Sequence, residues 1–346
     1  MFEYLPWSKQ ECDICMVNYT KKHFSILDLE LGGECNYNCV YCDSPDRKKE
    51  CNISLANIDR LMSEGEFRWV YICGLGEPTF GKNYSFLISL LSLCEKHNVR
   101  CSIFSNLSHL TEELKSYIRK GILYVLFKYD TKIASRVKSL YGTRKPEVQL
   151  NAIEELWPLV HFENGLTNIA ASIVPTQLNH GEILDIVKEC ITHNVFPLIG
   201  ELELSGKGQT NYYNLFLSQD ELTNIKSHVD KIWNGNYSIP VCPAVINGLH
   251  INNQNNITVD SFSGLSCHWF WLKEPITETL AHLDSEISLH TLTTAILNYR
   301  QEHINDVVGF LREYTRVGGA FGGCGGDVIQ LFKTYLTGMG VKYDLP

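Results

Sequence analysis

The chain has 346 residues, of which 44% are hydrophobic, and a formal net charge of −9. This length supports one large domain with a smaller one, and the composition excludes a disordered tail. The basic clusters, Lys21-Lys22 and Arg47-Lys48-Lys49, are short, and phosphate contacts need a basic stripe, so we expect no nucleic-acid partner. Residues 1–7 carry no signal-peptide pattern, and no segment approaches the ~20 apolar residues of a membrane span. We therefore expect no membrane partner and a cytoplasmic protein.

Thirteen cysteines in a chain without an export signal predict metal sites and reduced thiols rather than disulfides. The first two, Cys12 and Cys15, lie in an N-terminal segment, residues 1–24. A Cys-x-x-Cys pair can supply two ligands to a metal centre. No second pair lies close by in the sequence, so two free thiols on a flexible entry segment are an equal alternative.

An alternating apolar stretch, residues 25–31, predicts the first strand and leads directly into a loop with Cys35, Cys39 and Cys42. Three thiolates at spacings of four and three can bind three corners of a cubane iron–sulfur cluster and leave the fourth iron open. A structural zinc site normally needs four ligands, and a reducing cytosol disfavours disulfides. The loop therefore predicts a [4Fe-4S] cluster.

Beyond this loop, short apolar runs alternate with segments of helical periodicity. Six strands are expected, at residues 25–31, 69–73, 99–105, 122–128, 166–174 and 197–204. Helices are expected at residues 54–62, 84–97, 111–120, 132–140, 147–160, 182–193 and 218–233, the last with a capping box that starts at Ser218. This alternation predicts an α/β fold whose parallel sheet curls into a barrel or open barrel. Functional residues should lie at its carboxyl edge, where the cysteine loop falls.

The spacing Cys35-x3-Cys39-x2-Cys42, with Tyr41 before the last cysteine, resembles the signature of the radical S-adenosylmethionine (SAM) enzymes. The resemblance implies a partial (βα)6 TIM-like barrel, which agrees with the strand count and which we assign to residues 25–235. It also implies that SAM binds the open iron, with Tyr41 among the cofactor-binding residues. An electron from a flavodoxin- or ferredoxin-type reductant then cleaves SAM to a 5′-deoxyadenosyl radical, which abstracts hydrogen from the substrate.

The second predicted strand ends in a turn that resembles the family's Gly-Gly-Glu-Pro motif, which binds the SAM amino group. Glycines allow close backbone approach, and a sheet-edge backbone can hydrogen-bond an amino group. Leu75 replaces a glycine of the usual pattern. The resemblance assigns SAM binding to Gly74, Gly76, Glu77 and Pro78.

Three further strand ends carry polar side chains. Ser105 and Asn106 lie where the family contacts the ribose or carboxylate of SAM, although a loop asparagine that only makes a turn is an alternative. Lys128 can pair with a carboxylate of SAM or substrate, or reach solvent. Ser172 lies where relatives contact adenine through the backbone.

The sixth predicted strand ends in Glu201 and Glu203, which alternation places on one face. One of them can orient a polar substrate as a catalytic residue, or both form surface pairs. The glycine-rich residues 206–209 lack the ending of a phosphate loop, so we expect a loop near the mouth of the active site.

Regular alternation stops after Gly235, which predicts a smaller α+β domain at residues 236–346. Residues 248–251 and 257–260 are expected to form a hairpin. The layout resembles the SPASM/Twitch auxiliary-cluster domains and implies at most one further iron–sulfur cluster, with ligands Cys242, Cys267 and Cys324. Its fourth ligand would be Cys12 or Cys15, His268, or the substrate; three unrelated buried cysteines are the alternative. His250 and His268 are expected in the core or a pocket wall.

The leading hypothesis is a radical SAM enzyme that oxidises or epimerises a small polar metabolite or natural product. Oxidation needs an electron acceptor, which an auxiliary cluster can provide. Epimerisation needs a thiol that returns hydrogen, for which Cys73, Cys190 or an unligated Cys324 are candidates. One alternative is a maturase that crosslinks or epimerises a ribosomal peptide, although few residues precede the barrel. From another class, a non-catalytic iron–sulfur sensor or electron carrier is an alternative, against which the intact cluster loop argues.

Overall fold

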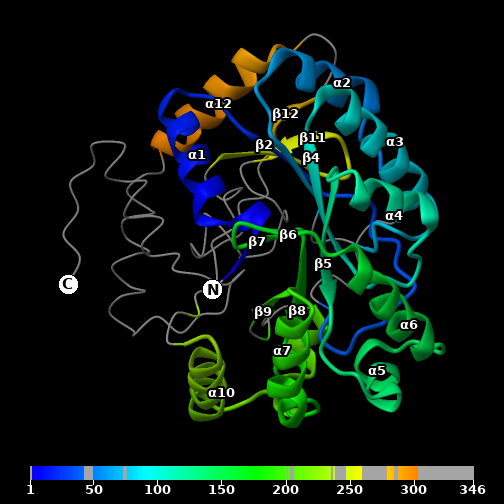
Figure 1. The fold of residues 1–346 in the computed structure, drawn as a ribbon. Helices are drawn as coiled ribbons and strands as arrows, with labels where there is room; N and C mark the ends of the chain where they lie inside the picture. The colour runs from blue at the N-terminus through cyan, green and yellow to red at the C-terminus, as the bar shows by residue number, and fades with distance from the viewer. Residues whose placement is uncertain are drawn as a thin grey trace.

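The structure is a computed structural model. It describes residues 2–42, 50–72, 76–200, 202, 206–234, 237, 247–258, 279–283 and 287–302. Within these ranges, a nine-stranded sheet curves through the molecule in the order β12-β11-β10-β2-β3-β4-β5-β8-β9, and helices surround it (Figure 1). None of the described helices is long and apolar enough to cross a membrane.

Six strands of this sheet follow one another in chain order, each parallel to the next. They are β2 (Ile26–Leu29), β3 (Trp69–Ile72), β4 (Arg100–Ser105), β5 (Leu123–Lys128), β8 (Ile169–Ile173) and β9 (Phe196–Ile199). The predicted partial (βα)6 barrel is therefore confirmed. The predicted strand at residues 166–174 is in fact two, since β7 (Leu166–Thr167) belongs to a separate small sheet.

Helices connect these strands and cover one side of the sheet (Figure 1). They are α2 (Leu55–Glu64), α3 (Gly81–His97), α4 (Glu112–Arg119), α5 (Ala134–Tyr141), α6 (Pro146–Leu156), α7 (Ile183–Thr192) and α10 (Gln219–Ile232). The 3-10 turn η2 (Trp157–Leu159) follows α6. Side-chain oxygens of Ser54, Thr111 and Ser218 accept hydrogen bonds at three N-termini, and the predicted capping box at Ser218 is confirmed.

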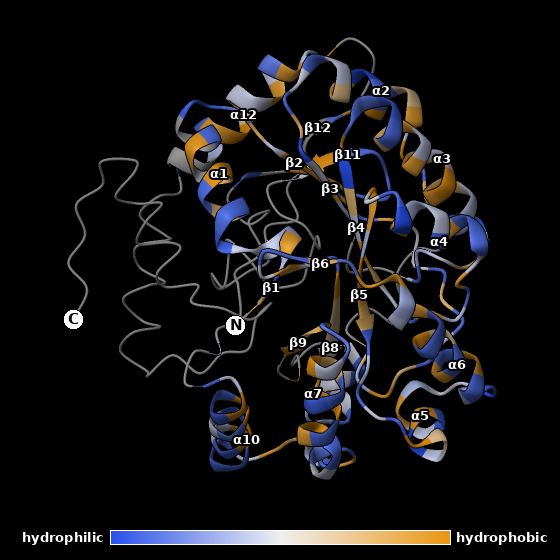
Figure 2. Cartoon of the chain, viewed as in Figure 1, coloured by the Kyte–Doolittle hydropathy of each residue, from blue (hydrophilic) through white to orange (hydrophobic). Residues whose placement is uncertain are grey.

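The two faces of each strand have different neighbours, because side chains alternate along a strand. Cys101 of β4 hydrogen-bonds Cys94 of α3, so the face that carries Cys101 points toward the helices. Ser102, the next residue, lies on the opposite, inner face, as do its register partners Tyr71 and Tyr124. In Figure 2, β5, β8 and β9 are largely orange, whereas the helices carry both colours, as expected for strands buried on both faces.

The N-terminal segment closes the amino end of this inner face. It consists of β1 (Glu3–Tyr4), which pairs with β7, then the 3-10 turn η1 (Leu5–Trp7) and α1 (Lys9–Thr20). The Tyr4 hydroxyl lies 2.9 Å from the Ser102 hydroxyl, and buried Glu11 accepts hydrogen bonds from Arg68 and from the Trp69 ring nitrogen. Cys12 and Cys15 therefore lie on a packed helix, not on a flexible entry segment.

The sheet continues beyond the six barrel strands. β10 (Gly248–Ile251) pairs in parallel with β2 and antiparallel with β11 (Asn256–Thr258), which confirms the predicted hairpin. β12 (Thr279–His282) adds an antiparallel edge, and α12 (Leu289–Glu302) follows it. Thus part of the segment beyond residue 235 extends the central sheet.

Candidate functional site

The three clustered cysteines lie on the loop of residues 32–42, which leaves the carboxyl end of β2. We call this segment the cluster loop. Cys35 is exposed, and Cys39 and Cys42 are partly buried. Although Cys35 is exposed, the surrounding protein partly desolvates its thiol, which raises the pKa to about 12, and the charges of Glu77, Cys39 and Cys42 add to this rise. Burial likewise raises the pKa of Cys39 to about 11, while the Lys128 charge lowers it. The thiols are near enough to interact, and binding a metal must displace their protons.

The donor chemistry of this loop fits a cluster better than a single ion. In the ranges that the structure describes, no three His, Cys, Asp or Glu side chains lie close enough to share one metal ion. A cubane binds each cysteine sulfur through a different iron atom, so its ligands stand farther apart than those of zinc. Three interacting thiols on one loop therefore suit an iron–sulfur cluster. Cys12 and Cys15 likewise belong to no such group of three among the described residues.

On one side, the cluster loop is fixed by the end of α5. The amides of Asn38 and Val40 donate hydrogen bonds to the carbonyls of Tyr141 and Leu140, at 2.8 and 2.9 Å. The rings of Tyr37 and Tyr141 stack with centroids 5.9 Å apart. The loop is thus held by backbone contacts that do not depend on the cysteines.

On another side, α8 (Gly206–Thr210) contacts the cluster loop. The Lys207 amide donates a hydrogen bond to the Cys42 carbonyl at 2.8 Å, and the Asn211 side chain donates one to the Val40 carbonyl at 2.7 Å. The Lys207 ammonium also hydrogen-bonds the Asn38 side chain. Residues 206–209 therefore lie beside the cluster loop, but the prediction of a loop there is wrong, because they form a short helix.

A third contact comes from the turn after β3. Gly76 has φ +63°, and a Cβ atom there would lie 2.2 Å from the Gly32 carbonyl oxygen, so only glycine allows this approach. Next to it, the Glu77 amide donates a hydrogen bond to the Glu34 carbonyl at 2.8 Å. The turn is therefore joined to the cluster loop by backbone. Pro78 is buried beside it.

The Glu77 carboxylate is buried and accepts four hydrogen bonds. They come from the Ser105 hydroxyl (2.6 Å), the Asn106 amide (2.7 Å), and the hydroxyl and amide of Thr79 (2.7 and 3.1 Å). Burial raises the pKa of Glu77, and these donors oppose the rise. The Asn106 side chain also donates to Asn36 of the cluster loop at 3.1 Å. Glu77, Ser105 and Asn106, which the sequence predicted separately, thus form one network.

Lys128 ends β5 on the inner face, against aromatic rings. Its Nζ atom lies 4.5 Å from the centre of the Tyr41 ring and 5.5 Å from those of Phe104 and Tyr141. It also donates a hydrogen bond to the Tyr41 hydroxyl at 3.1 Å. Ser172 is its register partner on β8. The structure therefore brings together three predicted cofactor residues, Tyr41, Lys128 and Ser172.

Asp130 links this group to neighbouring elements, and the sequence reasoning missed it. Its buried carboxylate accepts hydrogen bonds from the Tyr41 hydroxyl and, at 2.7 Å, from the Val174 amide after β8. Its own amide donates to the Tyr141 hydroxyl at 2.8 Å. Burial raises the pKa of Asp130, and the Lys128 charge opposes this. An aspartate two residues after a strand at the carboxyl edge was the available signal.

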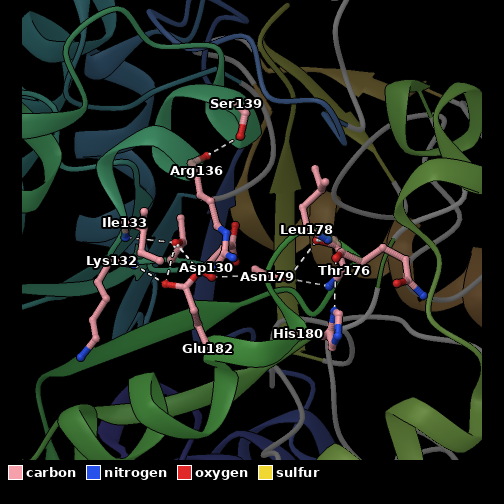
Figure 3. A network of polar contacts seen from close by, with 12 residues as sticks. Asp130, Lys132, Ile133, Arg136, Ser139, Thr176, Leu178, Asn179, His180 and Glu182 are labelled. Carbon is pink, nitrogen blue, oxygen red and sulfur yellow. Dashed lines mark hydrogen bonds and ion pairs between the residues drawn. The ribbon is translucent and has the colours of Figure 1, made fainter.

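A second layer of hydrogen bonds lies behind Asp130 (Figure 3). The Asn179 side chain donates to the Asp130 carbonyl at 2.8 Å and to the Val174 carbonyl at 3.0 Å. Glu182, at the start of α7, accepts from the Thr131 hydroxyl at 2.8 Å and pairs with Arg136. These contacts join the segments after β5 and β8.

Part of the chain is similar to a known protein family. Residues 29–157, from the end of β2 through α6, match the model of the Radical SAM superfamily. The match covers less than half of the chain. No curated protein matches the chain.

Solved structures of other proteins have a similar fold. The structure of SuiB from Streptococcus suis, bound to S-adenosylmethionine, has a TM-score of 0.57 at 15% identity. This match covers 80% of the present chain and 68% of SuiB. The protein anSMEcpe, bound to AdoMet, has a TM-score of 0.58 at 15% identity over 90% of this chain and 96% of its own. The structure of the same protein with AdoMet and the Cp18Cys peptide has a TM-score of 0.55 at 16% identity. This match covers 77% of the present chain and 79% of anSMEcpe. At these identities the likeness shows the fold.

Several predicted residues lie outside the described residues. They are Gly74, Glu201 and Glu203 at strand ends, Cys73, and the auxiliary-site candidates Cys242, Cys267, His268 and Cys324. Cys190, a candidate hydrogen donor, is fully buried on α7, where burial raises its pKa.

Proposed function

We propose that the chain is a radical SAM enzyme whose cluster loop holds a [4Fe-4S] cluster through Cys35, Cys39 and Cys42. When bound, such a cluster would supply the electron for reductive cleavage of SAM, which would start radical abstraction of hydrogen from the substrate. The observation that carries the proposal is the joining of the cluster loop to the Gly76-Glu77 turn by backbone contacts. A cluster ligand set and a cofactor-binding edge are thereby fixed relative to each other.

The remaining residues of the site bind and orient SAM in this proposal. The turn with Gly74, Gly76, Glu77 and Pro78 holds the amino group, with Glu77 fixing the turn through its four acceptor contacts. Ser105 and Asn106 support the ribose or carboxylate side. Lys128 supplies a positive charge for a carboxylate, and its neighbour Ser172 lies on the strand proposed to face adenine.

The substrate is proposed to be a small polar molecule or a peptide, oxidised or epimerised at a carbon–hydrogen bond. One of the similar structures, that of anSMEcpe, was solved with the Cp18Cys peptide bound, which supports the peptide alternative. Glu201 or Glu203 would orient the substrate. The net charge of −9 supports a partner other than nucleic acid, and a flavodoxin- or ferredoxin-type protein would supply electrons.

We further propose an auxiliary cluster in residues 236–346, held by Cys242, Cys267 and Cys324, beyond a barrel at residues 25–235. For an oxidation, this cluster would accept the second electron of the substrate. Cys12 and Cys15 are the less favoured ligands, since both lie on the packed helix α1.

The test is anaerobic reconstitution with iron and sulfide, followed by iron quantitation and an assay of 5′-deoxyadenosine with SAM and dithionite. The variant with Cys35, Cys39 and Cys42 all changed to Ala should lose SAM cleavage completely. Its matched control is Cys51→Ala, because Cys51 is also partly buried but lies outside the cluster loop. Wild-type protein that binds iron but does not cleave SAM would contradict the proposal and favour an electron carrier.

The same experiment tests the auxiliary cluster. About four irons retained by the triple variant support it, since one cubane holds four. No retained iron removes the auxiliary cluster and favours epimerisation or another redox-neutral reaction.

A further inference from the structure

Two buried polar side chains face each other across β2 and β10, away from the site described above. The Nδ1 atom of His250 lies 2.9 Å from a carboxylate oxygen of Asp28. The two side chains are only 2% and 3% exposed. Their strands pair in parallel with His250 opposite Asp28. A buried histidine–carboxylate pair in a sheet interior is expensive to desolvate, so it calls for a role.

The pair lies on the inner face of the barrel. Asp28 is the register partner of Tyr71, and Tyr71 is that of Ser102. Ser102 lies on the face opposite Cys101, which points toward α3. Hence His250 and Asp28 face the interior of the barrel, level with Tyr71 and Ser102.

Two more buried polar side chains share this part of the inner face. Glu30 follows Asp28 by two residues, just beyond the end of β2, and Thr258 of β11 is the register partner of His250. From Asp28 the chain runs only four residues to Gly32, about 13 Å at ~3.3 Å per residue, where the cluster loop begins. Asp28 thus lies on the strand that leads into the cluster loop, and His250 and Thr258 lie on the next two strands of the sheet.

The far nitrogen of His250 is the informative atom. Nε2 is buried and has no hydrogen-bond partner among the residues that the structure describes. Because Asp28 can only accept when ionised, the proton of a neutral His250 belongs on Nδ1, and Nε2 then carries a lone pair. A buried acceptor without a donor is unfavourable, and native proteins rarely leave one. The Nε2 atom can therefore accept a hydrogen bond from a group of a bound ligand.

We propose that His250 Nε2 anchors the substrate by accepting a hydrogen bond from an ammonium or hydroxyl group, with Asp28 holding the ring in the required tautomer. The nearby carboxylates of Asp28 and Glu30 favour a donor, and especially a cationic one, over an acceptor. The identification of this ligand as the substrate rests on the proposed function, whereas the existence of the binding site does not depend on it.

The test is an NMR titration of the reconstituted protein with 15N-labelled histidine and the cluster oxidised, with no reductant added. The probes are the N-acetyl methylamides of lysine, serine and norleucine, since norleucine matches the length of lysine without a donor. The His250 signals are assigned by their loss in His250→Gln, or in His250→Asn if the first variant does not fold. His282→Gln is the control, because His282 is exposed on β12.

We expect the resting spectrum to show Nδ1 protonated and Nε2 unprotonated. The lysine or the serine probe should shift the Nε2 signal saturably, the norleucine probe should not, and the two active arms distinguish ammonium from hydroxyl. Binding of that probe should weaken about tenfold in His250→Gln and be unchanged in His282→Gln.

Asp28→Asn provides a second measurement, since it removes the anion that selects the tautomer. The unprotonated Nε2 fraction and the probe affinity should fall together. A protonated Nε2 in the resting wild-type protein, or no shift with any probe, overturns the proposal. Neither result depends on SAM cleavage, so a failure here is distinguishable from a failure of the proposed function.

Discussion

At the amino end of the barrel the chain fills the inner face with its own side chains, whereas at the carboxyl end it uses its hydrogen bonds to fix loops. Glu11, Arg68 and Trp69 satisfy one another at the first end, and Tyr4 packs against Ser102. At the second end, Glu77 accepts only from groups that position the cluster loop and the strand ends. Two equally buried glutamates thus serve stability in one place and a site in the other.

Gly76→Ala should break the carboxyl end most strongly. The new Cβ atom would meet the Gly32 and Glu34 carbonyl oxygens at 2.2 and 2.6 Å, so the cluster loop must move. The matched control is Gly121→Ala, where φ is also positive but nothing lies within 4 Å. We expect Gly76→Ala to cost about 1–3 kcal/mol more than the control in urea unfolding, and to lose bound iron. Normal iron content in Gly76→Ala would contradict the close approach.

Replacing Glu77 and Glu11 tests whether the two ends of the barrel have different roles. Glu77→Gln turns a donor toward groups that already donate, and Glu11→Gln weakens the contact with Arg68. Each should lower the free energy of unfolding by about 1–3 kcal/mol, because each leaves a buried polar group unsatisfied. Only Glu77→Gln should also reduce SAM cleavage. Equal cleavage in the two variants, measured after reconstitution below both melting temperatures, would remove the distinction between the ends.

Tyr41→Phe should have a smaller effect, confined to the cofactor side. It removes the hydroxyl that joins Lys128 to the buried Asp130, at about 1 kcal/mol of stability. Tyr129→Phe removes a comparable hydrogen bond, to Glu189 on α7, away from the cluster loop. We expect both variants to bind iron, and only Tyr41→Phe to change the electron paramagnetic resonance spectrum of the reduced cluster when SAM is added. An identical response in the two variants would leave Tyr41 with a packing role only.

The smallest effect concerns the thiols of the two regions before metal is added. Partial desolvation raises the pKa of Cys35 to about 12, and burial raises that of Cys15 to about 12. A reagent can nevertheless reach Cys35, which is exposed, but not Cys15, which is 1% exposed. Since the thiolate is the reactive form, alkylation of Cys35 by iodoacetamide should be slow at pH 8 and rise about tenfold per pH unit up to about pH 11. Cys15 should stay unreacted while the protein is folded.

These pKa values also give folding stability a pH dependence. An unfolded thiol loses its proton near its usual pKa, whereas the partly buried Cys12 and the buried Cys15 have pKa values raised by burial to about 12. Between those values the unfolded state binds fewer protons, so stability is full below the usual pKa and falls as the pH rises through the window. Urea midpoints between pH 8 and 11 check the sign; a midpoint that rises with pH contradicts it.

Local sequence patterns predicted most of the fold. Apolar runs located β2 to β5 and β9, and Ser218 located the start of α10, because these signals lie within a few residues of the element they specify. The pairing of β10 with β2 and the packing of α1 under the barrel depend on contacts between distant segments, which periodicity does not contain.

The site was predictable to a similar depth. Cys35, Cys39, Glu77 and Lys128 stood out through their spacing or their position at strand ends. Asp130 and His250 did not, because a single aspartate in a loop and a single histidine in a strand have common structural roles. Asp130 and His250 become candidate functional residues only through their hydrogen-bond partners, Tyr41 and Asp28, which the structure reveals.

The position of β10 also constrains how the protein is made. His250 and Asp28 are 222 residues apart in sequence, so β2 keeps an unpaired edge until β10 has been synthesised. An exposed edge strand is a template for wrong pairing, and long-range parallel pairing is slow. The strand β2, which leads into the cluster loop, therefore gains its second neighbour only after the six barrel strands have been synthesised. His250 reaches the inner face at that late stage.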